Sequence, residues 1–269
     1  MSRSAMQSGQ VSADAAQVYE DAFVPALFQP WAPRVADAAA VRNGDSVVDI
    51  ACGTGVLARE VERRVGETGR VVGVDINPGM LAVARHKGPP RIDWREARAE
   101  SLPLRDASVD AVVSQFGLMF FEDRGAALRE MWRVLRPSGR LAIAVWDSLA
   151  HSPGYRTLAQ LLRELFGDGA AASLEAPFCL GDTQALHALL SASGIAGARI
   201  ETHAGEACYP SLEAWIFMNV KGWTLAGMLD DGQIEQLLVR ARTSLREFVA
   251  SDGRVHVPTP AHIVTATRH

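Results

Sequence analysis

Short apolar runs rich in β-branched residues alternate with amphipathic stretches along residues 44–146. Five of these runs predict β-strands, each ending where polar or glycine residues begin, at 46–50, 70–75, 92–95, 109–114 and 140–146. Apolar residues at helical spacing predict helices at 56–65, 78–86 and 126–135, the last closed by a glycine stop in RPSG (136–139). The loop 97–108 lacks clear helical periodicity. The alternation predicts an α/β domain built on a parallel sheet.

After residue 146 the pattern becomes mainly helical. Ser152 and Pro153 form a cap and first helical turn, and leucines at helical spacing follow near 158–166 and 186–190. Two further strands are predicted at 198–203 and 262–267. The segment between these strands carries two apolar sets at helical spacing: Leu212, Trp215, Ile216 and Trp223, then Ile234, Leu237, Leu238, Ala241, Leu245 and Phe248. We interpret them as packed helices that form a cap.

The composition is that of an ordinary folded protein. The 269 residues are 48% hydrophobic and 22% charged, with no low-complexity tract or fixed repeat. A formal net charge of −4 and the lack of a basic cluster argue against nucleic acid or an anionic membrane as partners. The longest apolar runs, such as 141–146, are far below the ~20 residues that cross a bilayer. Since the first residues lack a hydrophobic signal core, we expect a cytoplasmic protein.

Cysteine and histidine patterns give no metal or disulfide signature. Cys52, Cys179 and Cys208 are odd in number and share no C-x-x-C spacing, so we expect reduced thiols. The seven histidines are scattered without an H-E-x-x-H or H-x-H pair. We therefore predict no dedicated metal site.

The turn after the first strand, VVDIACGTGVLA (47–58), fits two kinds of ligand. Gly53, Gly55 and Ala58 satisfy the G-x-G-x-x-G/A pattern that places a dinucleotide pyrophosphate on a helix N-terminus. Asp49, however, is the last-but-one residue of the predicted strand and lies near its carboxyl end, where open α/β sheets bind ligands. A carboxylate there repels a pyrophosphate and attracts an ammonium group.

A second acid follows at the end of the second predicted strand. Asp75 stands twenty residues after Gly55, where a carboxylate can accept both hydroxyls of a ribose. NAD and S-adenosylmethionine both contain such a ribose, so Asp75 alone does not separate them. Together with Asp49, it favours a ligand that has a ribose and an ammonium group but no phosphate. S-adenosylmethionine fits this description better than a dinucleotide does.

Five segments carry a resemblance to a known family: VVDIACGTG, VVGVDINPGML, AESLPL, VDAVVSQFGLMFFED and LREMWRVLRPSGRLAIAVW. In this order and spacing they resemble the motifs of class I S-adenosylmethionine-dependent methyltransferases. Within this class the chain resembles the large group that includes the ubiquinone and menaquinone biosynthesis C-methyltransferases and small-molecule O- and N-methyltransferases. The resemblance covers residues 44–146.

The resemblance implies a fold and a domain organisation. The fold is α/β and Rossmann-like, with a seven-stranded sheet whose last strand is antiparallel, helices on both faces and a helical cap. We expect a single domain (1–269) with N-terminal lid helices (1–43), a cofactor-binding core (44–146) and helical cap segments (147–197 and 207–258). The implied cofactor is S-adenosyl-L-methionine, and its product is S-adenosyl-L-homocysteine.

The resemblance also implies roles for individual residues. Asp49 would hold the methionine ammonium, Gly53 and Gly55 would let the backbone approach the methionine portion, and Asp75 would bind the ribose. The other implied cofactor contacts are Ile76 and Met80 flanking the adenine, Ala99 and Glu100 at its edge, and Ser114, Gln115 and Phe116 beneath the sulfonium.

One position departs from the family pattern. Arg98 stands where many relatives carry an acid that accepts from the adenine amino group, and a guanidinium cannot accept a hydrogen bond. We expect Arg98 to turn to solvent and pair with a neighbour such as Glu96, and the adenine to be bound by backbone groups and Glu100.

The predicted function is methyl transfer to a small, partly apolar molecule. Aligning nucleophile, methyl and sulfur supplies much of such an acceleration, and a base is needed only for a poorly ionised acceptor. The candidate catalytic residues are Tyr19, in the N-terminal lid, and His151, just past the fifth strand. SQFG (114–117) replaces an NPPY-like motif, which argues against nucleic-acid bases or glutamine as acceptors.

Two alternatives stay open. An NAD-dependent oxidoreductase is compatible with the glycine pattern and Asp75, although Asp49 opposes it and no Tyr-x-x-x-Lys pair occurs. A non-catalytic S-adenosylmethionine-binding protein would carry the same cofactor motifs. The sequence does not decide the methyl acceptor or the oligomeric state.

Overall fold

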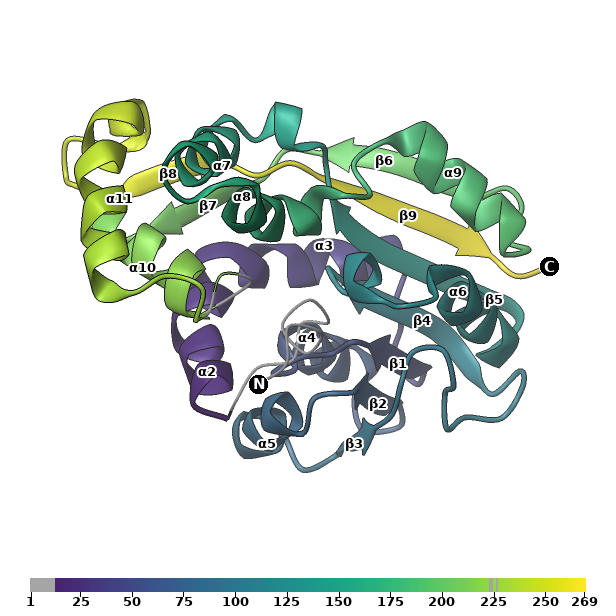
Figure 1. Cartoon of the computed structure of the whole chain (residues 1–269). Helices are drawn as coiled ribbons and strands as arrows, with labels where there is room; N and C mark the ends of the chain where they lie inside the picture. Colours follow the sequence, from purple (N-terminus) through teal and green to yellow (C-terminus); the bar gives the residue numbers. More distant parts are fainter. Residues whose placement is uncertain (1–12, 223–224, 226) are drawn as a thin grey trace.

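The predicted strands form one seven-stranded sheet in the order β3-β2-β1-β4-β5-β9-β6 (Figure 1). The computed structural model describes residues 13–222, 225 and 227–269. The strands of this sheet are β1 Ser46–Ile50, β2 Arg70–Asp75, β3 Ile92–Glu96, β4 Val109–Gln115, β5 Leu135–Trp146, β6 Arg199–His203 and β9 Ala261–Thr267. Neighbours from β3 to β5 are parallel, whereas β9 is antiparallel to both β5 and β6. The predicted sheet with an antiparallel last strand is confirmed.

Helices cover both faces of the sheet (Figure 1). α4 (Val56–Val65) connects β1 to β2 and α5 (Pro78–Lys87) connects β2 to β3, whereas α6 (Arg124–Val134) connects β4 to β5 and α9 (Thr183–Ala192) precedes β6. These two halves extend in opposite directions from the centre of the sheet, so right-handed crossovers place their helices on opposite faces. α3 (Ala32–Ala38) packs beside α4, across β4, β5 and β9, and α6 packs beside α9.

The helix ends show where capping signals in the sequence are reliable. The Asn77 side chain accepts hydrogen bonds from the backbone N–H groups of Gly79 (2.8 Å) and Met80 (3.1 Å), so α5 begins where the sequence predicts. The glycine stop predicted at 136–139 is wrong. α6 ends at Val134, and Leu135 adopts extended backbone and already pairs with the start of β4. The chain passes from helix to strand there without a glycine.

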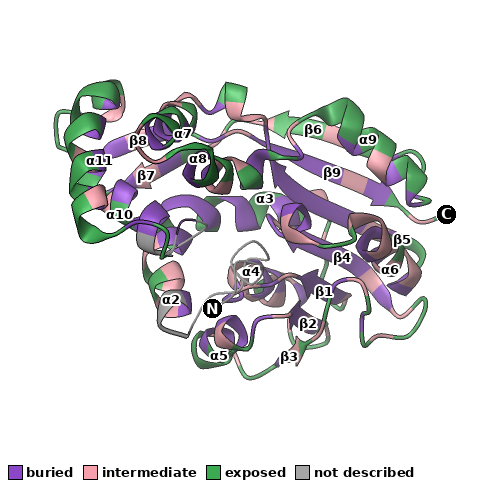
Figure 2. Ribbon diagram, in the orientation of Figure 1, coloured by how far each residue is buried: buried purple, intermediate pink, exposed green. Residues whose placement is uncertain are grey.

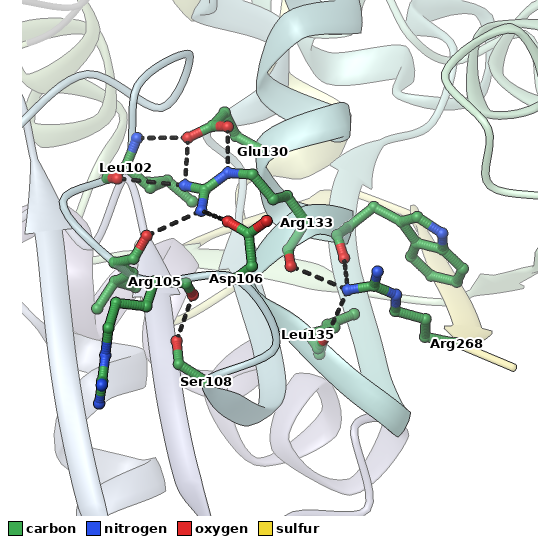
Figure 3. A network of polar contacts seen from close by, with 10 residues as sticks. Leu102, Arg105, Asp106, Ser108, Glu130, Arg133, Leu135 and Arg268 are labelled. Carbon is green, nitrogen blue, oxygen red and sulfur yellow. Dashed lines mark hydrogen bonds and ion pairs between the residues drawn. The ribbon is translucent and has the colours of Figure 1, made fainter.

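The loop 97–108 contains no helix and is held by Arg133 of α6 (Figure 3). The Arg133 guanidinium forms a two-point ion pair with Glu130, with N···O distances of 2.6 and 2.8 Å. It also donates to the backbone oxygens of Leu102 (3.3 Å) and Leu104 (2.9 Å) and to the Asp106 carboxylate (2.6 Å). Glu130 accepts from the Leu102 N–H at 2.8 Å. One side-chain pair thus satisfies backbone groups that regular structure would otherwise pair.

A cap is formed by the segments before β6 and between β6 and β9 (Figure 1). Its helices are η4 Leu149–His151, α7 Pro153–Phe166, α8 Asp168–Glu175, η5 Ala176–Phe178, α10 Leu212–Gly222, α11 Asp231–Ser244 and η6 Arg246–Phe248. Trp215, Ile216 and Leu237 are fully buried, as helical packing predicts. Trp223, also assigned to this packing, lies outside the described residues.

The cap also contains two strands that the sequence did not predict. β7 (Glu206–Tyr209) and β8 (Val255–Pro258) pair antiparallel in a separate two-stranded sheet. The segment 207–258 is therefore helical in its middle and extended at both ends. None of the described helices has the length and apolar character that a membrane span requires.

The described residues before β1 form a nearly continuous helical segment that packs on α5 at its start and on the sheet at its end. α2 (Ala13–Val18) packs on α5 and continues without a break through η1 (Tyr19–Phe28) and η2 (Gln29–Trp31) into α3. η1 is a π-helix that buries Phe23, Leu27 and Phe28. Residues 1–12 of the predicted lid segment 1–43 lie outside the described part of the chain. Figure 2 shows that the buried residues continue through α3 and the central strands β1, β4 and β5.

Candidate functional site

The turn between β1 and α4 is left-handed at three positions: Ala51 (φ 58°), Gly53 (φ 54°) and Gly55 (φ 88°). A Cβ added at Gly55 would lie 2.4 Å from the Trp94 ring, so packing excludes a side chain there. A Cβ added at Gly53 would meet none of the described atoms within 4 Å. The open backbone at Gly53 suits the close approach of a ligand, whereas Gly55 mainly allows α4 to pack against β3.

Asp49 is buried at the end of β1. It is 1% exposed, and within the described structure neither carboxylate oxygen has a partner at hydrogen-bonding geometry. Burial, and then the neighbouring charge of Asp75, raises the pKa of Asp49 well above its ordinary value, with a small opposing effect from the Ala58 N–H. An arriving cation would stabilise the charged carboxylate at this position.

Asp75 joins the end of β2 to the glycine turn. One carboxylate oxygen accepts from the Gly53 N–H at 2.8 Å, and the other accepts from the Asn77 N–H at 2.8 Å. Burial raises the pKa of Asp75, and these backbone donors partly oppose the rise. Each carboxylate oxygen retains a lone pair that can accept from a ribose hydroxyl.

Three more buried side-chain oxygens in this region have no hydrogen-bond partner among the described residues. They are Glu20 Oε2 on η1, Thr54 Oγ1 within the turn and Gln115 Oε1 at the end of β4. With the two oxygens of Asp49, this set is made of acceptors, apart from the Thr54 hydroxyl, which can also donate. A ligand that supplies donors and positive charge would satisfy it. The ammonium and ribose of S-adenosylmethionine fit this requirement, whereas a pyrophosphate does not.

The predicted adenine contacts lie in two different environments. Met80 is 7% exposed and packs in a small cluster with Ala16 of α2 and Val83, beside Tyr19. Ile76 is partly exposed at the end of β2, and the Ala99 side chain is buried. α2 thus covers the side of α5 that carries Met80, one of the predicted adenine contacts.

Arg98 and Glu100 are bonded differently from the prediction. Arg98 pairs with Glu122 at 2.7 Å and with Glu100 at 3.4 Å, so Glu96 is not its partner. Glu100 also accepts from the backbone N–H groups of Glu122 (3.2 Å) and Asp123 (3.3 Å), just before α6. Glu100 therefore fastens its loop to the start of α6. Its predicted contact with the adenine would compete with these bonds.

Ser114, Gln115 and Phe116 occupy the end of β4. The buried Ser114 hydroxyl donates to the Ile50 carbonyl at 2.7 Å, which ties the ends of β4 and β1 together. Gln115 Nε2 donates to the Phe28 carbonyl at 3.1 Å, so the lid segment is bonded to the sheet here. Gln115 Oε1 is buried and has no hydrogen-bond partner among the described residues, whereas Phe116 is 6% exposed.

Aromatic rings from the lid pack against rings at the carboxyl ends of β4 and β5. Phe116 has a left-handed backbone (φ 57°), and its ring stacks on Trp146 with a centroid distance of 3.6 Å and an interplanar angle of 6°. Trp31 contacts both rings edge-on, at 5.7 and 6.1 Å, and Phe28 approaches them at 5.9 and 6.1 Å. A non-glycine residue with positive φ is uncommon and is retained where the surroundings over-determine it. These stacked rings fix Phe116 in that conformation.

Tyr19 lies on η1 with its ring stacked on Phe28 at 5.1 Å. The pKa of its phenol is raised above the ordinary value by burial and then by the negative charges of Asp75, Glu20 and Asp49. The Tyr19 phenol therefore senses acids of η1, β1 and β2, and its predicted role over the cofactor stays a prediction. A phenol with a raised pKa stays protonated near neutral pH and serves as a hydrogen-bond donor rather than as a base.

His151 ends η4, just after β5, and is bonded to Asp147. Its side chain is 66% exposed, and Nδ1 is bonded to Asp147 Oδ2 at 2.9 Å. The other Asp147 oxygen accepts from the Ser148 N–H (2.6 Å) and lies 3.1 Å from His262 Nε2. Within the described part of the chain, His151 forms no side-chain hydrogen bond with the glycine turn or the end of β4. Its surface position does not favour the predicted role as a base.

Two residues that the sequence reading did not single out complete the site. Arg59 of α4 donates from Nη1 to the Thr54 carbonyl at 2.7 Å and from Nη2 to Glu20 Oε1 at 2.9 Å. This bridge connects the glycine turn to the lid. The available signal was the position of Glu20 next to Tyr19, but nothing in the sequence pairs Glu20 with a residue 39 positions away.

Part of the chain is similar in sequence to known methyltransferases. The family described as a methyltransferase domain matches residues 48–143, which extend from β1 through most of β5. The ubiquinone/menaquinone biosynthesis C-methyltransferase UbiE of Hahella chejuensis is 47% identical over 118 residues, and that of Escherichia coli O1:K1 is 42% identical over 118 residues. In each case the match covers 42% of this chain and 47% of the relative, so the chain spans about half the length of these relatives.

Solved structures share the fold over most of the chain. A putative methyltransferase of an antibiotic biosynthesis pathway from Anabaena variabilis has a TM-score of 0.64 at 16% identity, covering 88% of this chain and 96% of the other. A Haemonchus contortus phosphoethanolamine N-methyltransferase, in complex with S-adenosylhomocysteine, has a TM-score of 0.62 at 18% identity, covering 96% and 57%. The class I methyltransferase fold and the predicted resemblance are confirmed.

Proposed function

We propose that this chain is an S-adenosylmethionine-dependent methyltransferase that transfers a methyl group to a small, partly apolar molecule. The observation that carries the proposal is the carboxylate of Asp49 at the glycine turn, which is buried and has no hydrogen-bond partner among residues 13–222, 225 and 227–269. A buried acid of this kind opposes a phosphate and favours a cationic ligand. The match of residues 48–143 to a methyltransferase domain supports the same assignment.

The chain's residues would divide the cofactor between them. Asp49 would hold the methionine ammonium, Asp75 the ribose, and the open backbone at Gly53 would pass beside the methionine portion. Ile76 and Met80 would flank the adenine, near the backbone of Ala99 and with Glu100 at its edge. When bound, the cofactor supplies an activated methyl group on a positively charged sulfur.

The rest of the proposed mechanism is positioning. Tyr19 and Phe28 of the lid and Phe116 after β4 would exclude water from the reacting atoms, because the Phe28 ring contacts both of the other rings. Alignment of the acceptor with the methyl and sulfur atoms would supply most of the rate enhancement. Tyr19 would orient the methyl acceptor by donating a hydrogen bond to it. Gln115 would hold the lid against the sheet through the Phe28 carbonyl and offer its free oxygen to the ligand.

The character of the acceptor is inferred from the covering residues. Aromatic side chains dominate the lid and the end of β4, which favours a molecule with an apolar or planar portion. The curated relatives are named as C-methyltransferases of quinone biosynthesis, which is consistent with an acceptor of this kind. We keep the lid (1–43), core (44–146) and cap (147–197 and 207–258) as functional divisions, with the acceptor between lid and cap.

Calorimetric titration tests the cofactor assignment. The wild type should bind S-adenosylmethionine and S-adenosylhomocysteine, and Asp75→Ala should weaken both by about tenfold or more, because a lost charge-assisted pair of hydrogen bonds costs about 1.5–3 kcal/mol. Asp93→Ala is the matched control, since Asp93 is exposed and pairs with Arg95. Failure of the wild type to bind either compound would refute the proposal, and a thermal shift with NAD alone would restore the oxidoreductase alternative.

Turnover separates an enzyme from a binding protein. The wild type should release S-adenosylhomocysteine when incubated with S-adenosylmethionine and a panel of phenols, quinones, amines and acids. Binding of the cofactor without turnover across the whole panel would favour the non-catalytic alternative.

A further inference from the structure

Glu20 places a third acid at the predicted cofactor site. It is the second residue of η1, directly after Tyr19, and its side chain is 10% exposed. One carboxylate oxygen accepts from Arg59 Nη2 at 2.9 Å, and Arg59 Nη1 donates to the carbonyl of Thr54, the middle residue of the G-T-G turn, at 2.7 Å. Glu20 is therefore fixed to the turn from the lid side.

The second oxygen of Glu20 is not used by this bridge. Glu20 Oε2 is buried, and within the described part of the chain it has no hydrogen-bond partner. A purely structural ion pair does not require a second, unsatisfied oxygen, and burying one costs free energy. Asp49 of β1 likewise has buried carboxylate oxygens that no described residue hydrogen-bonds. Two acids from different elements, η1 and β1, thus keep unsatisfied acceptor oxygens.

The charges of this group are unbalanced. Asp49, Asp75 and Glu20 carry three negative charges when ionised, and among the described residues Arg59 is bonded to one of them, Glu20. The Tyr19 phenol lies close enough to all three acids for each to raise its pKa. S-adenosylmethionine carries a net charge of +1, from its ammonium, carboxylate and sulfonium, whereas S-adenosylhomocysteine is neutral overall. The excess of negative charge matches the reactant and not the product.

We propose that Glu20 is a specificity residue of the cofactor site, and that its free carboxylate oxygen favours the positively charged sulfonium of S-adenosylmethionine over the neutral thioether of S-adenosylhomocysteine. This inference rests on the proposed function. It adds a role for the lid that is separate from covering the cofactor, because a lid that only excludes water would not distinguish the two compounds by charge.

The role has a consequence for turnover. In methyl transfer an acceptor lone pair forms the new bond to the methyl carbon, the sulfur–carbon bond breaks, and its electron pair stays on sulfur. The positive charge thereby leaves the sulfur and passes to the methylated acceptor, or to the proton that the acceptor releases. Glu20 then loses an attractive partner, so product affinity falls at the moment when the product must leave. The same carboxylate serves capture of the reactant and release of the product.

A ratio of affinities tests this role. For the wild type and Glu20→Gln, calorimetry at low ionic strength should give the dissociation constants of S-adenosylmethionine, S-adenosylhomocysteine and sinefungin, which carries an ammonium in place of the methylated sulfur. Glutamine keeps an oxygen for Arg59 and nearly the same shape. We expect Glu20→Gln to weaken S-adenosylmethionine and sinefungin by about fivefold and S-adenosylhomocysteine by less than about twofold, as for loss of one screened charge several ångströms away.

Asp21→Asn is the matched control. Asp21 is the next residue of η1, but its side chain is 57% exposed and bonds to Gln17 and Lys87, so the ratio of the two affinities should not change. Equal losses for all three ligands in Glu20→Gln would overturn the inference and leave Glu20 as a structural link. Such a result would leave the proposed function intact, because that fails only if the wild type does not bind the cofactor.

A measurement on the wild type covers the case in which Glu20→Gln does not fold. Raising the ionic strength should weaken S-adenosylmethionine more than S-adenosylhomocysteine, because only the former has a net charge to be screened. An identical salt dependence for both compounds would contradict charge discrimination at this site.

Discussion

Replacing Asp49 by asparagine should stabilise the cofactor-free protein while removing its affinity for the cofactor. The wild-type carboxylate is buried at the end of β1, and neither oxygen has a partner among the described residues. An unsatisfied buried polar group costs about 1–3 kcal/mol, and a charge costs more than a neutral amide. We therefore expect Asp49→Asn to raise the free energy of unfolding by about 1–2 kcal/mol near neutral pH, or about 2–6 °C in Tm for a chain of this size.

The dependence on pH distinguishes this cause from others. Burial and Asp75 raise the pKa of Asp49 above its unfolded value. Between these two pKa values the folded state binds more protons than the unfolded state, so wild-type stability falls as the pH rises through this interval. The advantage of Asp49→Asn should be small near the ordinary aspartate pKa of about 4 and should grow toward neutral pH.

Denaturation with and without ligand measures both effects. Urea unfolding at several pH values gives the stability, and S-adenosylhomocysteine at about one hundred times its dissociation constant should add about 2.7 kcal/mol to the wild type but little to Asp49→Asn. Asp168→Asn is the control, since that side chain is 91% exposed, and it should change neither quantity. If Asp49→Asn is less stable than the wild type at neutral pH, or retains the full ligand effect, the reasoning about the unpartnered carboxylate is wrong.

Three further predictions concern the packing, the loop and the surface histidine. Gly55→Ala should destabilise the protein by about 3 kcal/mol in urea unfolding, because the added Cβ overlaps the Trp94 ring and Gly55 has φ 88°; a loss below about 1 kcal/mol would show that the ring moves freely. Arg133→Met should lower stability by about 2 kcal/mol, since it leaves Glu130 and the loop carbonyls without their donor. The hydrogen bond from Arg133 is the main reason that the pKa of Glu130 lies below its ordinary value. The loss of stability in Arg133→Met should therefore shrink as the pH falls through that pKa, whereas a loss that does not change with pH would assign the effect to packing. His151→Ala should leave the rate of methyl transfer within about twofold, because the ring is exposed, and a loss above about tenfold would restore its role as a base.

The strands of the main sheet were predictable because their side chains are set by local pattern. Continuous β-branched runs such as VVDI and RVVGVD are typical of strands buried on both faces, and the observed bounds of β1 and β2 equal the predicted ones. β7 and β8 have four residues each and bury alternate side chains only after they pair with each other across the cap. That pairing is a long-range contact, and no local pattern encodes it.

The site was predictable where a single segment encodes it and not where two segments meet. Asp49 and Asp75 lie at the ends of β1 and β2, and Gly53 lies in the turn after β1, so their common edge of the sheet follows from the motif order; their contact with a cofactor stays a prediction. The bonds of Arg98 and Glu100 to the start of α6, and the bridge of Glu20 to Arg59, depend on tertiary placement of residues more than twenty positions apart. The sequence suggests Glu96 as a partner for Arg98 because the two are close in the chain. The observed partner Glu122 comes near Arg98 because α6 begins just after it.

The position of β9 determines when the sheet can be completed. β9 lies between β5 and β6, although residues 147–260 separate it from β5 along the chain. Until residues 261–267 are synthesised and paired, β5 and β6 each present an unpaired strand edge, which is a template for association with other chains. The core strands β1–β5 contact each other through shorter loops and need not wait. Completion of the sheet therefore depends on one long-range closure, in which residues 261–267 pair with β5 and β6 at the same time.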